Sequence, residues 1–219
     1  MSIKITTLVE NSVYGKGLQG EHGLSLLVDT GEHRLLFDTG ASDLFIRNAR
    51  ILGIDLKEVD FLVLSHGHRD HTGGLHHFLA VNDKAQVVCK RELFQSKFKD
   101  ERENGVMQPD ALDGTRFRFV DEVTELCRGV FVFPQLPVTD EEDTHFEHFF
   151  TWAEGRKQAD TFTDELALVL KQDAEVSVLS ACSHRGITNI IRAVQEYFPQ
   201  TSLKLVLGGF HTVSYTHLR

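Results

Sequence analysis

One stretch, residues 65–74, constrains the fold of this chain more than any other. Its sequence is Ser-His-Gly-His-Arg-Asp-His-Thr-Gly-Gly, and it follows a short apolar run at 61–64 that is typical of a buried strand. Three imidazoles and one carboxylate within six residues can offer lone pairs to one centre, and zinc and similar metals accept both ligand types. A solvated histidine-rich loop is the alternative, which the strand before and the glycines after disfavour. The stretch therefore predicts a metal site at a strand end, formed by His66, His68, Asp70 and His71.

Each half of this motif can serve a different ion. Alternate side chains of a turn can face different directions, so we expect His66 and His68 to bind one metal and Asp70 and His71 to bind a second. A turn supplies only part of each coordination shell, because a zinc ion takes four or more ligands. The remaining ligands must therefore come from elsewhere in the chain.

Two later histidines stand where the missing ligands are expected. His184 follows a predicted strand at 176–179, and His211 follows another at 203–207. In sheets that are covered on both faces, ligand sites gather beyond the carboxyl ends of the strands. We therefore expect both side chains to approach the histidine motif.

Other residues near predicted strand ends allow two interpretations each. Asp38 ends a strand, and we expect its carboxylate to orient a ligand imidazole from the second coordination shell rather than only to stabilise the glycine turn after it. Asp164 and Glu165 either approach the metals or lie on the surface. Cys182 is either a soft ligand or a buried apolar residue, and burial is favoured. Surface or helix-face positions are expected for His76, His77, His145 and His148.

The size and composition of the chain indicate a single globular domain. A chain of 219 residues with 41% hydrophobic residues can bury a substantial core, and its apolar runs are too short to span a membrane. Residues 1–9 alternate apolar and polar side chains, unlike the continuous apolar block of a signal peptide. We expect a cytoplasmic protein with one domain at 1–211.

Charge and cysteine content exclude several other classes. The net charge is −9 without a basic run, which argues against a nucleic-acid binder and leaves a small molecule as the expected substrate. The three cysteines are widely spaced and form no C-x-x-C motif, so neither a disulfide framework nor a thiolate zinc cage is indicated. The oligomeric state stays open.

The apolar runs predict strands followed by strand–helix alternation, which is typical of a layered α/β domain. The charged segment 91–103 is compatible with a helix. The phenylalanine-rich stretch 146–152 either belongs to the core or covers the site, and the core is favoured. Strands are expected at 3–9, 24–29, 34–38, 61–64, 85–89, 116–120, 130–133, 166–170, 176–179 and 203–207, and helices at 42–53, 74–81 and 187–197.

Three short motifs match the residue pattern of known signatures, but their surroundings in the sequence rule out the corresponding functions. Residues 15–20 fit the dinucleotide-binding pattern G-x-G-x-x-G, but a strand follows them where that motif requires a helix. Asp-Thr-Gly at 38–40 would need a second aspartate to share a proton, as in aspartic proteases. Residues 96–99 fit S-x-x-K, and the companion motifs of serine penicillinases are absent from the sequence.

Taken together, the motifs resemble the metallo-β-lactamase superfamily, on residues 66–71 preceded by Phe-Asp-Thr-Gly at 37–40. The resemblance narrows to a branch of metal-dependent hydrolases related to the dihydropterin–ribofuranosyl-aminobenzene-phosphate synthases of archaeal methanopterin biosynthesis. It extends over residues 3–211. The motifs that carry the narrower resemblance lie at 21–27, 64–68, 164–168, 182–187 and 208–211.

This resemblance implies an αβ/βα sandwich of two mixed sheets flanked by helices, with a dinuclear site at one edge of the sheets. It assigns ligand roles to the four residues of the histidine motif and extends them to His184 and His211. Asp70 is expected to be catalytic by orienting a water molecule. Two divalent ions are the implied cofactors, zinc first, with iron or manganese as alternatives. Many family members carry a bridging aspartate where this chain has Ala-Cys-Ser-His at 181–184, so the bridging ligand stays open.

The C-terminal residues depart from the family pattern. Family members continue beyond Gly-Gly-Phe-His with a further helix and strand, whereas residues 212–219 match nothing in the family. The sequence therefore predicts a truncated chain without the last strand and helix, ending in a non-native tail in which His217 has no role.

Three functions follow from these observations as hypotheses. The first is a hydrolase that activates water against an ester, phosphoester or related bond of a small, phosphorylated or pterin-like substrate, with synthase activity on a pterin precursor as a variant. The second is an iron-dependent redox enzyme on the same fold. The third is a protein that binds metal without catalysis because the chain is truncated.

Overall fold

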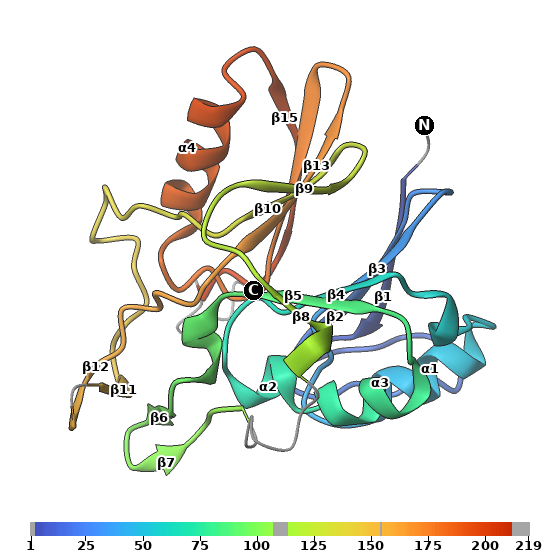
Figure 1. The fold of residues 1–219 in the computed structure, drawn as a ribbon, viewed down its shortest axis with the longest axis horizontal. Helices are drawn as coiled ribbons and strands as arrows, with labels where there is room; N and C mark the ends of the chain where they lie inside the picture. Colours follow the sequence, from blue (N-terminus) through green and yellow to red (C-terminus); the bar gives the residue numbers. More distant parts are fainter. Residues whose placement is uncertain (1–2, 107–113, 154, 212–219) are drawn as a thin grey trace, which may run out of the picture.

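A computed structural model describes residues 3–106, 114–153 and 155–211, and its largest sheet has six strands (Figure 1). The first three strands pair antiparallel, and the pairs from β3 onward are parallel. In sheet order the strands are β1 (Lys4–Val9), β2 (Ser25–Asp29), β3 (Arg34–Phe37), β4 (Phe61–Val63), β5 (Gln86–Cys89) and β8 (Phe117–Phe119).

A second sheet of five strands packs against the first. Its neighbouring strands pair antiparallel, except that β14 and β15 pair parallel. In sheet order they are β15 (Ser202–Gly208), β14 (Glu175–Ser180), β13 (Ala167–Gln172), β10 (Val130–Phe133) and β9 (Thr124–Cys127).

Helices cover the outer faces of both sheets. The helices α1 (Leu44–Ile51) and α3 (Leu75–Val81) share one apolar cluster with the six-stranded sheet. The helix α4 (Ile187–Tyr197) shares another with the five-stranded sheet, and a third cluster fills the space between the sheets. In Figure 1 the helix α4 lies at the upper left and α1 and α3 lie along the lower edge. These four layers confirm the αβ/βα sandwich that the resemblance implies.

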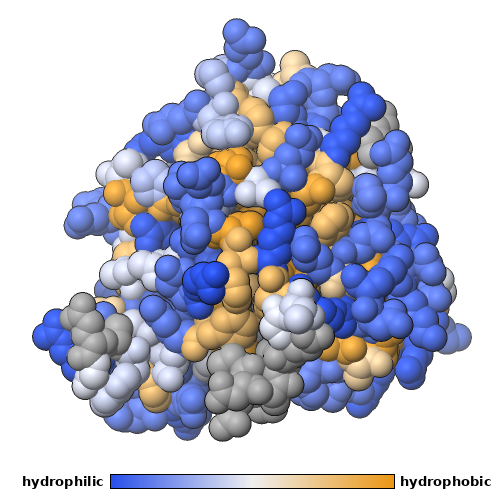
Figure 2. Space-filling model, in the orientation of Figure 1, coloured by the Kyte–Doolittle hydropathy of each residue, from blue (hydrophilic) through white to orange (hydrophobic). Residues whose placement is uncertain are grey.

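The strands of the six-stranded sheet are apolar at successive positions because their side chains point alternately to two buried faces. In β3, Leu36 packs toward the helices, whereas Leu35 and Phe37 pack toward the second sheet. A strand that is buried on both faces must be apolar at every position. Figure 2 shows that apolar side chains still reach the surface, gathered in a band down the middle of the face in view with polar side chains on both sides.

A small third sheet was not predicted. It contains β12 (Arg156–Ala159), β11 (Phe149–Ala153), β6 (Lys97–Lys99) and β7 (Arg102–Glu103), so the expectation of a helix over 91–103 is wrong beyond a short 3₁₀ turn at Arg91–Phe94. The local sequence favours a helix, but β6 pairs with β11 about fifty residues later, and such tertiary pairing overrides local propensity.

The remaining helical elements are short. They are the 3₁₀ turns Leu56–Glu58 and Gly114–Arg116 and the single turn α2 (Arg69–Thr72). Within the described ranges, no helix combines the length and the apolarity that crossing a bilayer requires. The predicted tail at 212–219, including His217, lies outside the described residues.

Candidate metal centre

The histidine motif forms the connection between β4 and α3, as its place after an apolar run predicts. Gly67 is required within it, because a side chain there would come within 2.4 Å of the Leu93 carbonyl oxygen. The Gly67 N–H donates a hydrogen bond of 2.6 Å to the Asp164 carboxylate, which comes from a segment 97 residues further along. The motif is therefore fixed by contacts with distant parts of the chain.

Three imidazoles converge at this point. His66, His68 and His184 are buried, and each offers a ring nitrogen within 4.8 Å of the others. The Nε2 atoms of all three are buried and have no hydrogen-bond partner among the described residues. Buried polar atoms are almost always partnered, so three unpartnered nitrogens that face one point fit a metal ion.

The protonation of these rings suits metal binding. Burial lowers the pKa of His68 to about 3, and burial together with the neighbouring imidazoles lowers the pKa values of His66 and His184 well below the ordinary value. A neutral imidazole is the form that binds a metal, because its lone pair is free. The three rings are held in that form at neutral pH.

A second set of donors lies beside the first. His71 groups with His66 and Cys182, and its Nε2 atom lies 3.1 Å from the Cys182 Sγ atom and 3.5 Å from the Asp70 carboxylate. Burial alone would raise the pKa of Asp70, but the neighbouring histidines, above all His71, outweigh it and hold that pKa well below its usual range. Asp70 is therefore an anion at neutral pH.

His211 reaches the same region from the end of β15. Its ring lies 4.5 Å from the His184 ring, centroid to centroid, and it groups with Cys182 and His184. His211 is exposed, unlike the other five predicted ligands. Cys182 belongs to two donor groups and stands in the segment where the family pattern has a bridging aspartate. It is also buried, as was favoured from the sequence.

Asp38 lies directly behind the histidine motif. One carboxylate oxygen is 2.8 Å from His71 Nδ1 and accepts a hydrogen bond of 2.6 Å from the Ser65 hydroxyl, while the other accepts the Ser65 N–H. A buried carboxylate on the far nitrogen of an imidazole fixes the tautomer and orientation of that ring. This is the contact that the predicted orienting role of Asp38 requires.

A buried ion cluster supports the motif from the third sheet. Lys97 has no exposed surface, and its Nζ atom lies 2.7 Å from the carboxylates of both Asp160 and Asp164. Burial alone would lower the pKa of Lys97, but the two carboxylates outweigh it and raise that pKa. Asp164 thus links the charged lysine to the Gly67 N–H. Sequence analysis missed Lys97 and Asp160, because no local signal distinguishes them from surface residues.

Glu165 performs the corresponding task on the other side of the site. Its two carboxylate oxygens accept the backbone N–H groups of His184 and Arg185, each at 2.8 Å. Burial raises the pKa of Glu165 to about 7, although these two hydrogen bonds lower it. Both Asp164 and Glu165 are fully buried beneath the site, so the surface alternative for them is wrong.

Aromatic rings cover the imidazoles. Phe162 stacks on His184 with centroids 3.7 Å apart, and Phe149 packs against His68 at 4.9 Å and His184 at 5.0 Å. In the stretch 146–152, Phe149 is buried, as the preference for core packing predicts, and it also packs against the site. Phe162 carried no signal in the sequence, since it lies in a short loop before Asp164.

His145 was expected on the surface, and its position is different. Its Nε2 atom is buried and has no hydrogen-bond partner among the described residues. Its backbone N–H donates a hydrogen bond of 2.7 Å to the His184 carbonyl, and its backbone carbonyl lies 3.2 Å from His184 Nδ1. The segment 144–146 therefore pairs with His184 and fixes its ring. The expectation holds for His76 and His148, which are exposed.

The six predicted ligands thus lie in one region. The His66 ring is at its middle and packs against the rings of His68, His71 and His184. The roles of the six as ligands remain predictions. Two carboxylates and a carbonyl behind the imidazoles fix the geometry, and the phenylalanine rings limit the access of water to the buried nitrogens.

Known proteins similar to this chain identify its family. The family model of the metallo-beta-lactamase superfamily matches residues 18–164. A 7,8-dihydropterin-6-methyl-4-(beta-D-ribofuranosyl)-aminobenzene-5'-phosphate synthase of Methanocaldococcus jannaschii is 28% identical over 97% of this chain and 78% of its own length. An uncharacterized protein of the same organism is 30% identical over 95% of this chain and 79% of its own length.

Solved structures show the same fold. The crystal structure of a metal-dependent hydrolase of the beta-lactamase superfamily matches with a TM-score of 0.83 and 33% identity, covering 99% of this chain and 79% of that one. A quorum-quenching N-acyl homoserine lactone lactonase shares the fold at a TM-score of 0.51 and 14% identity, covering 88% of this chain and 82% of its own. On its fold, its donor groups and these matches, the chain belongs to the metallo-β-lactamase superfamily.

Proposed function

We propose that this protein is a hydrolase with a dinuclear metal centre, zinc first among the candidate ions, that directs water against an ester or phosphoester of a small substrate. The observation that carries the proposal is the convergence of three buried, neutral imidazoles, those of His66, His68 and His184, whose Nε2 atoms have no hydrogen-bond partner among the described residues. The likeness to a metal-dependent hydrolase over 99% of the chain supports the reaction class.

Two adjacent donor sets favour two ions over one. His66, His68 and His184 form the first set, and His71 with Cys182 and Asp70 forms the core of the second. We assign His211 to the second set on its grouping with Cys182, and Cys182, which groups with residues of both sets, would be available as a ligand to either ion. Divalent ions in such a pair lower the pKa of water and polarise a phosphoryl or carbonyl oxygen.

The side chains around the centre have distinct tasks in this proposal. The ionised carboxylate of Asp70, whose side chain is 19% exposed, accepts a hydrogen bond from the attacking water and orients it. Asp38 fixes the ring of His71, and Glu165 fixes the backbone of His184. Phe149 and Phe162 exclude bulk water from the imidazoles, which strengthens every electrostatic interaction between them.

A second candidate reaction is a synthase reaction on a pterin precursor. It is favoured by the 28% identity to the Methanocaldococcus jannaschii synthase, which extends over 97% of this chain. Both reactions would use the same centre. A substrate with a phosphate group suits a protein of net charge −9 only if metal ions supply the positive charge.

Metal content and turnover test the proposal together. We expect purified protein to contain about two divalent ions per chain, and His68→Ala to lose at least one of them with the fold intact by circular dichroism. Hydrolysis in a panel of aryl phosphodiesters, phosphomonoesters and lactones is expected to stop after exhaustive chelation and to return with added zinc.

A matched variant makes this test specific. His76→Ala removes an exposed imidazole from α3, five residues from the last histidine ligand of the motif and ten from the first, and it should keep both ions and full turnover. Undiminished turnover in exhaustively chelated protein would refute the hydrolytic centre. Metal-dependent activity restricted to joining pterin and aryl-ribosyl phosphate substrates would favour the synthase instead.

A further inference from the structure

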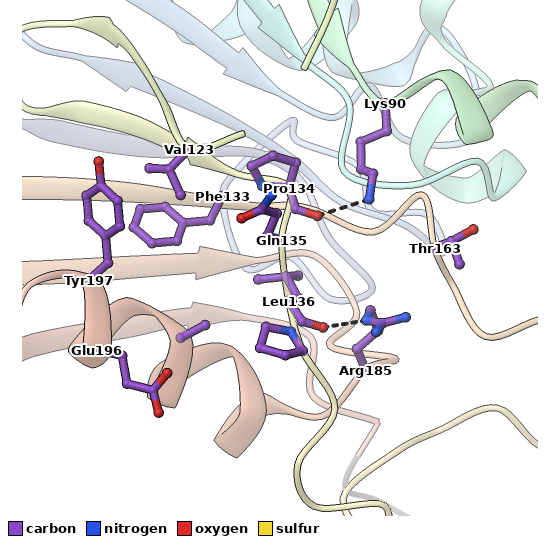
Figure 3. Close-up of a pocket in the computed structure, with 12 residues that line it drawn as sticks. Lys90, Val123, Phe133, Pro134, Gln135, Leu136, Thr163, Arg185, Glu196 and Tyr197 are labelled. Carbon is purple, nitrogen blue, oxygen red and sulfur yellow. Dashed lines mark hydrogen bonds between the residues drawn. The ribbon is translucent and has the colours of Figure 1, made fainter. Parts of the chain in front are cut away.

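A cavity of about 640 Å³ opens beside α4, and its lining contains none of the predicted metal ligands. It lies between the end of β10, the residues after β5 and one face of the helix (Figure 3). A volume of this size holds a small organic molecule. The cavity is therefore large enough to be a binding site in its own right.

Two cations line one end of this cavity. Lys90 donates a hydrogen bond of 3.0 Å from Nζ to the Pro134 carbonyl, and Arg185 donates one of 2.6 Å from Nε to the Leu136 carbonyl. Arg185 also donates from Nη1 to the Thr161 carbonyl. An ammonium group has three N–H donors and a guanidinium group has five, so both cations keep donors beyond these bonds.

Neither cation has a carboxylate at ion-pair distance within the described ranges, in contrast to Lys97 with its two. Both are more than half buried. Burial lowers the pKa of Lys90, and the positive charge of Arg185 acts in the same direction, although Glu92, Asp164 and Asp121 act in the opposite one. An anion between them would relieve this repulsion.

The opposite end of the cavity is apolar and aromatic. The rings of Phe133 and Tyr197 lie together, 5.3 Å apart between centroids, on the side away from the two cations in Figure 3. Pro134, Leu136 and Pro137 form the wall between the two ends. Glu196 is the acidic residue of the lining and stands on the helix near Tyr197, so an anionic group is repelled from the aromatic end.

We propose that this cavity binds a small planar organic anion, an aryl phosphate or aryl carboxylate, with the acidic group between Lys90 and Arg185 and the ring against Phe133 and Tyr197. The charged end supplies hydrogen bonds with ionised partners, which are about twice as strong as neutral ones. The aromatic end supplies stacking and apolar contact. The site is separate from the metal centre and does not depend on the reaction proposed there.

Phenylphosphonate is a suitable probe, because its carbon–phosphorus bond resists hydrolysis at a metal centre. In the zinc-loaded protein with ¹⁵N label, we expect saturable shifts of the backbone amides of Gln135, Leu136 and Arg185. Lys90→Met should weaken this binding by about tenfold, the typical loss for a hydrogen bond to a charged group. Methylphosphonate and benzyl alcohol, which each lack one half of the probe, should bind at least about tenfold more weakly.

Two further variants show whether a loss of binding comes from the site itself or from misfolding. Ala193→Phe fills the cavity from α4 without removing a hydrogen bond and should abolish binding while metal content and turnover stay unchanged. Lys204→Met removes an exposed lysine from β15 and should leave binding intact. Equal affinity in Lys90→Met and wild type, shifts confined to residues 66–71, or equal binding of methylphosphonate would overturn the proposal.

Discussion

The two halves of the candidate metal centre are built in different ways. The first half is a single loop of the six-stranded sheet that carries four donors between His66 and His71. The second half consists of single residues, Cys182, His184 and His211, that follow strands of the five-stranded sheet. We call the first the dense half, because its donors are close together in the sequence, and the second the dispersed half, because only the fold brings its donors together.

The supports behind the two halves also differ. His71 has a buried carboxylate, Asp38, on its Nδ1 atom, whereas His184 has the backbone carbonyl of His145. A carboxylate polarises an imidazole more strongly than a carbonyl does, because it carries a full charge. The comparison teaches that in the dense half a buried carboxylate contacts a ligand ring directly, whereas in the dispersed half Glu165 holds only the backbone of His184, and a carbonyl and packed rings contact its imidazole.

The largest expected effect comes from removing the cation beneath the dense half. Lys97→Met leaves Asp160 and Asp164 buried without their partner, and breaking a buried ion pair in this way costs about 3–5 kcal/mol. We expect the free energy of unfolding, measured by urea denaturation, to fall by that amount. Lys99→Met, two residues away on the same strand and exposed, should stay within about 1 kcal/mol, since its ammonium only faces the Phe149 ring. Equal losses in the two variants would show that the buried charges are not what supports this half.

A smaller effect is expected from neutralising the carboxylate behind His71. Asp38→Asn keeps the shape of the side chain but removes the charge that orients the imidazole and holds Ser65. We expect zinc affinity to fall by about 10- to 100-fold, as for other residues that orient metal ligands. Competition with a chelating dye measures it. Asp43→Asn, whose carboxylate pairs with Arg47 on the exposed side of α1, is the matched control and should keep full affinity. An unchanged affinity in Asp38→Asn would remove the distinction between the two halves.

The last prediction concerns the thiols in the bodies of the two sheets, which have no expected effect on the metal centre. Burial raises the pKa of Cys89, in the first sheet, to about 12 and that of Cys127, in the second, to about 11. A raised pKa means less thiolate, so at pH 8 Cys127 should react with iodoacetamide roughly 100-fold more slowly than an unperturbed cysteine. Chelation should leave both rates unchanged and alter that of Cys182, measured by peptide mass spectrometry. A constant rate at Cys182 would count against its role as a metal ligand.

Sequence reasoning located the dense half and the strands around it, because their signals are local. Four donors in six residues and apolar runs with flanking glycines need no knowledge of the fold. His184 and His211 were found through the position of strand ends. Lys97 and His145 were not found, because neither a lysine in a charged segment nor a lone histidine has a local sequence pattern that tells whether its side chain is exposed or buried. Their partners lie 63 and 39 residues away in the chain.

The pairing of Asp164 with Gly67 has a consequence for biosynthesis. The hydrogen bond spans 97 residues, and the next residue, Glu165, holds the backbone of His184. Contacts of this range form late, since the chain between them must be made and closed first. A nascent chain whose histidine loop has just emerged from the ribosome still lacks the later supports, Asp164 and Glu165, and the three donors that follow strands of the second sheet. The centre thus becomes competent to take up metal only after the residues up to β15 have been made and both sheets are in place.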